Sequence, residues 1–282
     1  MQLGKFQLKT ISGGRFLLDG GTMFGVVPKV MWSRLIPPNE QNLIQQDTKC
    51  LFLDTGDHRV LIDTGYGSKL LEKQRRVFDI SEGDALLDNL SEAGITADDI
   101  DTVILTHLHF DHAGGATQIS EDGNLSCTFP NATYFVQRRE WIEANSGAPE
   151  LRGAYASENF EAIEQAGQLK LLDGNVEIIP GIRSWVTGGH TLGHQALVIE
   201  SEDQSAVYLG DLCPTSRHLP RLWGMSYDLD ILQIRRCKPE ILGTIADRDW
   251  WALFDHDPDV AAARLARAEK REFIVSESLE HI

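Results

Sequence analysis

The stretch "VILTHLHFDHAGG" (103–115) decides how this chain folds, because it joins a buried strand directly to a dense group of metal-binding side chains. Its first residues are apolar or β-branched and predict a strand. Three histidines and one aspartate follow within six positions. The spacing of His107, His109 and Asp111 points these three to one side of an extended segment, and His112 follows as the chain turns. Imidazole and carboxylate are typical ligands of Zn²⁺ and similar ions, so the segment predicts a metal site.

Three further candidate ligands stand directly after other apolar strands. They are His190 after "SWVTGG" (184–189), Asp211 after "VYLG" (207–210) and His256 after "WALFD" (251–255). Proteins of the α/β class build sites from distant chain segments at the ends of strands. We therefore expect these three side chains to belong to the same site as the histidines of the opening stretch.

The bulk composition predicts one globular domain spanning 1–282. The chain is 42% apolar and contains neither a repeat nor a Pro/Gly/Ser-rich linker. A net charge of −16 argues against a nucleic acid or an anionic membrane as a partner. No apolar stretch is long enough for a signal peptide or a membrane span. Since the four cysteines form no C-x-x-C pair, we expect a cytoplasmic protein with reduced thiols.

Short apolar strands with interspersed amphipathic helices predict an α/β architecture. Residues 50–54 and 59–63 flank the turn "TGDH" and predict a hairpin. Residues 20–42 mix glycine, proline and large apolar side chains, which predicts an irregular N-terminal arm. The segment "DPDVAAARLARAEKR" (257–271) predicts a helix capped by Asp257, so we expect 259–282 to form a C-terminal helix and tail.

Five blocks of the chain, taken in order, resemble the metallo-β-lactamase-fold hydrolases. They are "VLIDTG" (60–65), "THLHFDHAGG" (106–115), "GGHTLGH" (188–194), "GDL" (210–212) and "FDHD" (254–257). The arm segment "MFGVVPKVMW" (23–32) is similar to the branch that holds N-acyl-homoserine-lactone lactonases and methyl-parathion-type hydrolases. The resemblance implies a four-layer αβ/βα sandwich with two metal ions at one edge.

The resemblance also implies a division of the ligands between two metal positions. His107, His109 and His190 would hold the first ion, Asp111, His112 and His256 the second, and Asp211 would bridge both. Zinc is the default for such a nitrogen and oxygen set, although manganese, iron and cobalt accept the same ligands. Two ions lower the pKa of a shared water toward about 7, so the bridging hydroxide attacks the substrate. Asp111 and Asp211 are the catalytic candidates, with Asp111 passing the proton to the leaving group.

Residues near the ligands are candidates for supporting roles. Asp63 follows a predicted strand and either orients a ligand histidine or caps the strand. His194 occupies a motif position, and we expect it to pack beside or orient a ligand. Four side chains are candidates for lining an acyl or aryl groove, with core packing as the alternative for each: Phe24, Phe110, Met225 and Tyr227.

One position departs from the lactonase pattern. That pattern places a tyrosine three residues after the bridging aspartate, where it touches the substrate carbonyl oxygen, but this chain has Pro214 there. Tyr208 and Tyr227 are the candidate replacements. The departure favours the branch with ester or organophosphate activity over a strict lactonase.

The combined hypothesis is a dinuclear metallo-hydrolase of a small, fairly apolar lactone or ester, with phosphotriester cleavage as a side activity. An N-acyl-homoserine lactone is one candidate substrate. The alternatives are a thioesterase resembling glyoxalase II and a binding module that retains the metals without turnover. A homodimer formed through 20–42 is a further hypothesis.

Overall fold

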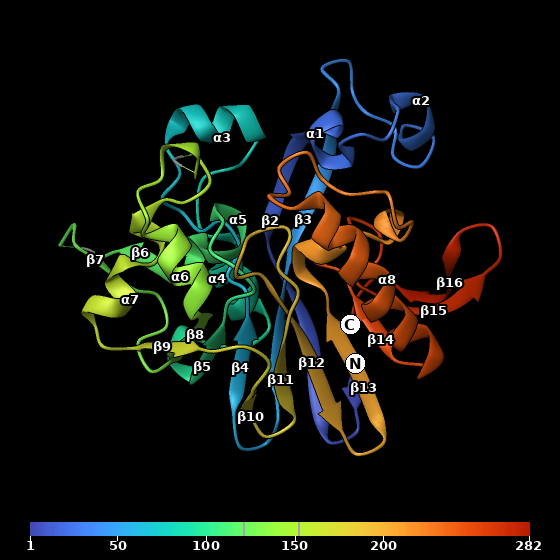
Figure 1. The fold of residues 1–282 in the computed structure, drawn as a ribbon. Coiled ribbons are helices and arrows are strands. Elements are labelled where there is room, and N and C mark those ends of the chain that lie inside the picture. The colour runs from blue at the N-terminus through green and yellow to red at the C-terminus, as the bar shows by residue number, and fades with distance from the viewer. Residues whose placement is uncertain (121, 152) are drawn as a thin grey trace.

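Two seven-stranded sheets lie face to face in the computed structural model, which describes residues 1–120, 122–151 and 153–282 (Figure 1). The first sheet has the order β1 (Gln2–Leu3), β2 (Phe6–Asp19), β3 (Leu43–Asp54), β4 (Arg59–Ile62), β5 (Thr102–Ile104), β8 (Thr133–Gln137), β9 (Leu169–Leu172). The second has the order β10 (Glu177–Ile179), β11 (Ile182–Val186), β12 (Gln195–Ser201), β13 (Gln204–Tyr208), β14 (Trp251–Leu253), β15 (Ala262–Ala268), β16 (Glu272–Leu279). The strands β6 (Thr117–Ile119) and β7 (Leu125–Cys127) form a small separate sheet.

The main core lies between the two large sheets. Successive residues of β5 show why, since Val103 packs on the outer side of the first sheet and Ile104 packs between the sheets. Leu197 and Ile199 of β12 meet Ile104 from the second sheet. Because both faces of these strands are covered, they appear in the sequence as continuous apolar runs rather than alternating patterns.

Helices cover the outer face of each sheet. The first sheet is covered by α4 (Ala85–Glu92), α6 (Arg138–Ala144) and α7 (Glu161–Gln165), and the second by α8 (Ile231–Asp247) (Figure 1). The remaining helices are short: α1 (Gly20–Phe24), α2 (Lys29–Trp32), α3 (Glu72–Phe78) and α5 (Phe110–Ala113). The layers confirm the expected α/β, four-layer αβ/βα sandwich.

The predicted C-terminal helix is wrong. Residues 262–268 and 272–279 form the antiparallel strands β15 and β16. Alanine and arginine favour helices, but β14 needs a partner for its backbone groups, and β15 supplies it. Arg264 then stacks over the ring of Trp251, with its guanidinium carbon 4.4 Å from the ring centroid. Asp257 therefore caps no helix. Its carboxylate instead accepts from the backbone N–H of Ser216 and pairs with Arg217.

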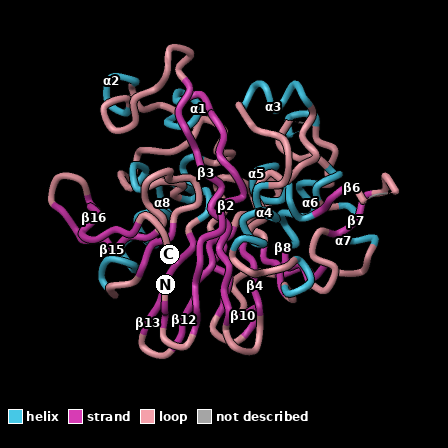
Figure 2. Tube along the Cα trace, turned by 180° about the vertical axis from the view of Figure 1, so that it is seen from behind, coloured by secondary structure: helices cyan, strands magenta, loops and turns pink. Residues whose placement is uncertain are grey.

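The N-terminal arm is held by its own apolar cluster. Figure 2 shows β2 and β3 running side by side as long strands toward the arm, which contains α1 and α2. The cluster consists of Met23, Phe24, Val27, Trp32, Ile36, Ile44 and Met225. Phe24 and Met225 are therefore core residues of the arm, and neither appears among the residues that line the cavity described below.

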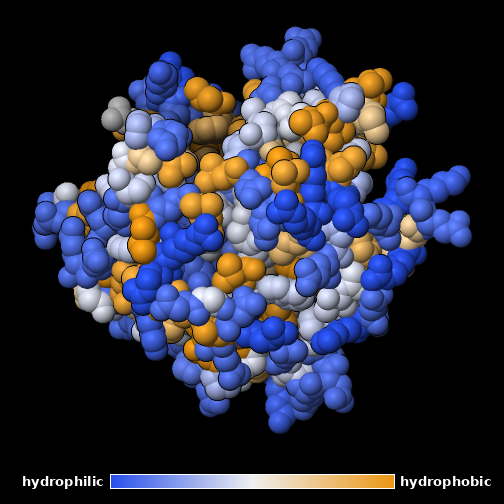
Figure 3. Space-filling model, in the orientation of Figure 1, coloured by the Kyte–Doolittle hydropathy of each residue, from blue (hydrophilic) through white to orange (hydrophobic). Residues whose placement is uncertain are grey.

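Apolar side chains of the arm also face solvent. Val26, Val30, Met31 and Leu35 are 74%, 63%, 50% and 44% exposed. Figure 3 shows hydrophobic residues gathered over this part of the surface, at the upper right. An exposed apolar group of this kind is typical of a surface that contacts another molecule.

Phe24→Ala is expected to lower the free energy of unfolding by about 3–5 kcal/mol, because it leaves a cavity between two stacked rings. The Phe24 ring lies 4.6 Å from the ring of His218 and 5.3 Å from that of Trp32, centroid to centroid. Urea unfolding measures the change. Val26→Ala is the control, since its exposed side chain predicts a change within about 0.5 kcal/mol. Equal stability of the two variants would contradict the packing described here.

Candidate metal centre

The candidate ligands follow strands that end at the same edge of the fold. The segment of His107 and α5 follows β5, and His190, Asp211 and His256 follow β11, β13 and β14. Since β13 pairs in parallel with β14, their carboxyl ends emerge side by side. The edge of the second sheet therefore faces α5 and the loop before it, which together carry the other candidate ligands (Figure 1).

One group of four side chains is suited to a first ion: His107, His109, His190 and Asp211 each offer a ligand atom within 4.8 Å of the others. His190 Nε2 lies 2.9 Å from Asp211 Oδ2 and 3.0 Å from His109 Nδ1. His107 Nε2 lies 3.8 Å from the same Asp211 oxygen. The three histidines predicted for the first metal position therefore do meet.

A second group lies on the other side of Asp211. Its members are His112, Asp211, Asp255 and His256. Asp211 Oδ1 lies 3.2 Å from His256 Nε2 and 3.6 Å from His112 Nε2. Asp111 lies beside this group, with Oδ2 3.6 Å from His256 Nε2. The structure thus brings all seven predicted ligands together and adds Asp255, which the sequence analysis did not single out.

The side chains fit a pair of divalent cations. Three of their atoms are buried without a hydrogen-bond partner among the described residues: His107 Nε2, Asp211 Oδ1 and Asp255 Oδ2. Ligands about 2.0–2.1 Å from a tetrahedral ion stand about 3.3 Å apart. The contacts of Asp211 with the surrounding imidazoles, from 2.9 to 3.8 Å, bracket that spacing. A buried polar atom without a hydrogen-bond partner costs free energy, and a bound cation would remove that cost.

Asp63 fixes the orientation of one ligand histidine. Its Oδ2 accepts from His112 Nδ1 at 2.9 Å, so His112 Nε2 points toward Asp211. Thr106 donates to the same carboxylate from its backbone N–H at 2.8 Å and from its hydroxyl. Asp63 adopts a left-handed backbone with φ of 58°, an unusual conformation for a residue other than glycine.

Two further orienting contacts were missed in the sequence. Asp228 Oδ1 accepts from His190 Nδ1 at 2.9 Å, and the backbone carbonyl of Asp47 accepts from His256 Nδ1 at 2.7 Å. Neither residue lies near a ligand in sequence, so no spacing signal marks them. His194, which the sequence did mark, accepts the backbone N–H of Asp211 at 3.0 Å.

The charged side chains of the candidate metal centre shift one another's pKa values. Burial alone raises the pKa of Asp211, but His190, His112 and His256 outweigh it and hold that pKa well below its ordinary range. Burial lowers the pKa of His190, whereas the Asp211 and Asp228 carboxylates outweigh it and raise the pKa to about 10. Without metal, protonated histidines therefore balance the negative charge of the carboxylates at neutral pH. Bound divalent cations would replace those protons.

A cavity of about 400 Å³ opens onto the candidate ligands His109, Asp111 and Asp211. Its remaining lining residues are Phe16, Leu18, Phe78, Phe110, Glu150, Gly153, Ala154 and Tyr227. Of the four groove candidates, Phe110 and Tyr227 line this cavity, whereas Phe24 and Met225 pack in the core of the arm, the alternative given for them. Phe16 and Phe78 were missed because they come from β2 and α3, which the sequence gives no reason to place opposite the ligands.

Tyr208, one of the two candidate replacements for the missing tyrosine, lies behind the ligands. Its hydroxyl donates to the backbone carbonyl of Lys49 at 2.9 Å and lies 3.3 Å from Asp63 Oδ2. Its side chain is buried and lines no part of the cavity. Of the two candidates, Tyr227 is the one that lines the cavity.

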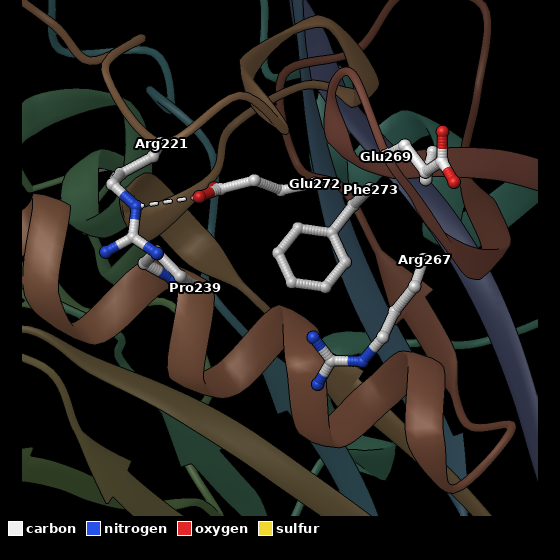
Figure 4. A pocket seen from close by; sticks show the side chains of 7 residues that line it. Arg221, Pro239, Arg267, Glu269, Glu272 and Phe273 are labelled. Atoms are coloured by element: carbon white, nitrogen blue, oxygen red, sulfur yellow. Dashed lines mark hydrogen bonds and ion pairs between the residues drawn. The ribbon is translucent and has the colours of Figure 1, made fainter.

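A second cavity, of about 420 Å³, lies between α8 and the β15–β16 hairpin (Figure 4). Its two arginines are already paired. Arg221 Nε lies 2.9 Å from Glu272 Oε1, and Arg267 binds the Asp247 carboxylate through two nitrogens. The cavity shares no lining residue with the candidate metal ligands.

Comparisons with known proteins agree with this geometry. A family model described as "Metallo-beta-lactamase superfamily" matches residues 45–271. An N-acyl homoserine lactonase from Bacillus sp is 27% identical over 213 residues, which cover 72% of this chain and 74% of the relative. Within the described ranges, every helix is too short or too polar to span a lipid bilayer.

Solved structures of similar proteins share this fold over nearly the whole chain. A probable metal-dependent hydrolase from Staphylococcus aureus is 34% identical, with a TM-score of 0.88 over 99% of this chain and 100% of the other. An N-acyl homoserine lactone hydrolase, solved with the product N-hexanoyl-L-homoserine at its catalytic metal centre, is 25% identical. Its TM-score is 0.66, over 91% of this chain and 94% of the other.

Proposed function

Because this chain belongs to the metallo-beta-lactamase superfamily of hydrolases, we propose that its substrate is a small, fairly apolar lactone or ester. The observation that carries the proposal is the cavity of about 400 Å³ that opens directly onto Asp111 and Asp211. Phe16, Phe78 and Phe110 form an aromatic wall there, with the Phe78 and Phe110 rings stacked 5.2 Å apart. Such a wall suits an acyl or aryl group, as in the N-acyl homoserine lactone of the relatives.

The proposed cofactor is a pair of divalent ions, with zinc as the default. Such a pair supplies an activated water and a positive charge beside the substrate carbonyl. Asp211 holds the two positions together, because its oxygens face different histidines. Asp111 faces the cavity with 14% of its side chain exposed, which suits it to carry a proton to the leaving alkoxide.

A substrate panel tests the proposal. The metal-loaded protein is offered N-acyl homoserine lactones of increasing chain length, aryl esters and phosphotriesters, together with a glutathione thioester. We expect the highest kcat/KM for a lactone or ester, rising with acyl length as the aromatic wall fills, and weaker phosphotriester cleavage. Failure on lactones, esters and phosphotriesters alike would overturn the proposal, and a dominant thioester activity would favour the glyoxalase II-like alternative.

We also propose that Tyr227 binds the substrate carbonyl in place of the tyrosine absent at Pro214. Tyr227 lines the cavity, and its ring lies edge-on to the ring of His190 at 5.9 Å. Its hydroxyl contacts only a thioether among the described residues, Met23 Sδ at 3.3 Å. A thioether is a weak acceptor, so the hydroxyl is free to donate to a substrate.

Tyr227→Phe is expected to lower kcat/KM by about 10-fold or more, because one hydrogen bond to a developing charge is lost. Steady-state kinetics on the best substrate measure the change. Tyr134→Phe removes a buried hydroxyl whose partners lie at Ala116 and Phe129, away from the cavity, and should leave kcat/KM unchanged. Equal kinetics for Tyr227→Phe and the natural protein would contradict the role.

The exposed apolar side chains of the arm support a homodimer as a further proposal (Figure 3). Light scattering on the natural protein should give twice the chain mass. A double variant, Val30→Asp with Met31→Asp, should give a monomer, because charges would be buried in the contact. A monomeric natural protein at every concentration tested would remove the proposal.

A further inference from the structure

We propose that Asp255 is an additional carboxylate ligand of the second metal position, beside Asp111, Asp211, His112 and His256. The inference rests on the paired metal site of the proposed function, but not on its substrate. Asp255 follows β14 directly and precedes the ligand His256. Its side chain is 2% exposed, and it belongs to the second group of converging ligand atoms.

The Asp255 carboxylate is held with one oxygen occupied and the other free. Oδ1 accepts the backbone N–H of His256 at 3.0 Å. Oδ2 is buried without a hydrogen-bond partner among the described residues, and it lies 3.9 Å from His256 Nε2. The backbone N–H of Lys49 donates to the Asp255 carbonyl at 2.8 Å, which fixes the segment. The free oxygen therefore faces the second position on a fixed backbone.

The polar groups near this oxygen already have hydrogen-bond partners of their own. The Lys49 ammonium binds the Asp47 carboxylate and the backbone carbonyl of Asp257. The Tyr208 hydroxyl donates to the Lys49 carbonyl. Asp63, the other neighbour, is itself a carboxylate. No described donor makes a hydrogen bond to Asp255 Oδ2, whose nearest charged groups are the His112 and His256 imidazoles at 3.9 Å. A buried carboxylate oxygen without a hydrogen bond is costly.

Water does not fill the role either. The void beside Asp255 has about 0 Å³ of space for a water molecule, and its other lining residues are Thr48, Lys49, Cys50, Asp63, Asp111, His112, Tyr208 and His256. A divalent cation is smaller than a water molecule and contacts carboxylate oxygens at about 2.0–2.2 Å. The geometry therefore favours a cation as the partner of the free oxygen.

The added ligand makes the two positions chemically unequal. The first position has three imidazoles and the Asp211 carboxylate, whereas the second has two imidazoles and three carboxylates, those of Asp111, Asp211 and Asp255. Oxygen-rich sites favour harder ions and higher coordination numbers than nitrogen-rich sites. The second position is therefore expected to accept Mn²⁺ more readily, relative to Zn²⁺, than the first.

Metal titration of the full-length, chelator-stripped protein tests this inference without any substrate. The natural protein should take up two equivalents of Zn²⁺ against a competing chelator. Asp255→Asn should bind the first equivalent within about twofold of the natural affinity and the second about 10- to 100-fold more weakly, with a larger loss for Mn²⁺. Asp257→Asn is the matched control, because that buried carboxylate pairs with Arg217 outside the metal groups.

Thermal unfolding of the same metal-free samples separates a ligand from a structural carboxylate. Removing an unpaired buried charge should raise the Tm of metal-free Asp255→Asn, while the increase in Tm on adding Zn²⁺ should shrink. Unchanged affinity for both equivalents would overturn the inference, and so would a metal-free Asp255→Asn that is less stable or fails to fold. A natural protein that binds two ions but hydrolyses nothing would overturn the proposed function alone.

Discussion

Asp211→Asn is expected to lower kcat/KM by about 10³-fold or more and to reduce bound metal below two ions per chain. The Asp211 oxygens face two different sets of imidazoles, with Oδ2 2.9 Å from His190 Nε2 and Oδ1 3.2 Å from His256 Nε2. An amide offers one weak acceptor and one donor, so it cannot hold two cations together. Kinetics and elemental analysis on the same sample measure both effects.

The control for this substitution is Asp249→Asn, which changes the same pair of atoms on the surface. The Asp249 side chain is 82% exposed and lies 3.5 Å from Arg264, and it precedes β14, whereas His256 follows that strand at its other end. Its activity and metal content should match those of the natural protein. An Asp211→Asn variant that keeps both ions and full turnover would show that Asp211 bridges nothing.

Asp111→Asn is expected to lower kcat/KM by about 10²- to 10⁴-fold, the range typical of a positioned proton donor. Asp111 lines the cavity and also lies 4.0 Å from His112 Nε2, so it serves both the leaving group and the second metal position. The dependence on the leaving group separates these roles. An ester with an acidic phenol should lose less activity than a lactone, because a phenolate needs no proton to depart.

Asp111→Asn with two bound ions and equal losses on both substrates would contradict the proton-transfer role. The same variant also bears on the difference between an enzyme and a metal-retaining binding module. Turnover by the natural protein that depends on Asp111 assigns the hydrolysis to this site, whereas a contaminating hydrolase would be insensitive to the change.

The sequence predicted that the candidate ligands converge because their positions follow a simple rule of topology. His190, Asp211 and His256 each come soon after an apolar strand, and parallel pairing brings the ends of β13 and β14 to one edge. The α/β class likewise followed from buried strands such as β5, whose alternate residues pack on opposite faces, whereas the four-layer sandwich was implied by the family resemblance. These features depend on local patterns that a sequence displays directly.

The features that were missed depend on contacts between distant segments. The alanine-rich 262–268 forms a strand because β14 offers it backbone partners, which outweighs the intrinsic preference for helix. Phe16 joins the cavity wall only once the two sheets have packed, and Asp228 reaches His190 only once the loop before α8 has folded onto the loop after β11. Asp255 was overlooked beside a stronger neighbour, His256, although its carboxylate is buried without a partner.

Zinc titration of the metal-free protein, with hydrolysis of its best lactone or ester followed at each addition, tests the paired metal site most directly. We predict negligible turnover without metal and activity that rises until two equivalents are bound, then stops rising. Full turnover in the chelator-stripped protein, or activity that is complete at one equivalent, would contradict a hydrolase built around two ions.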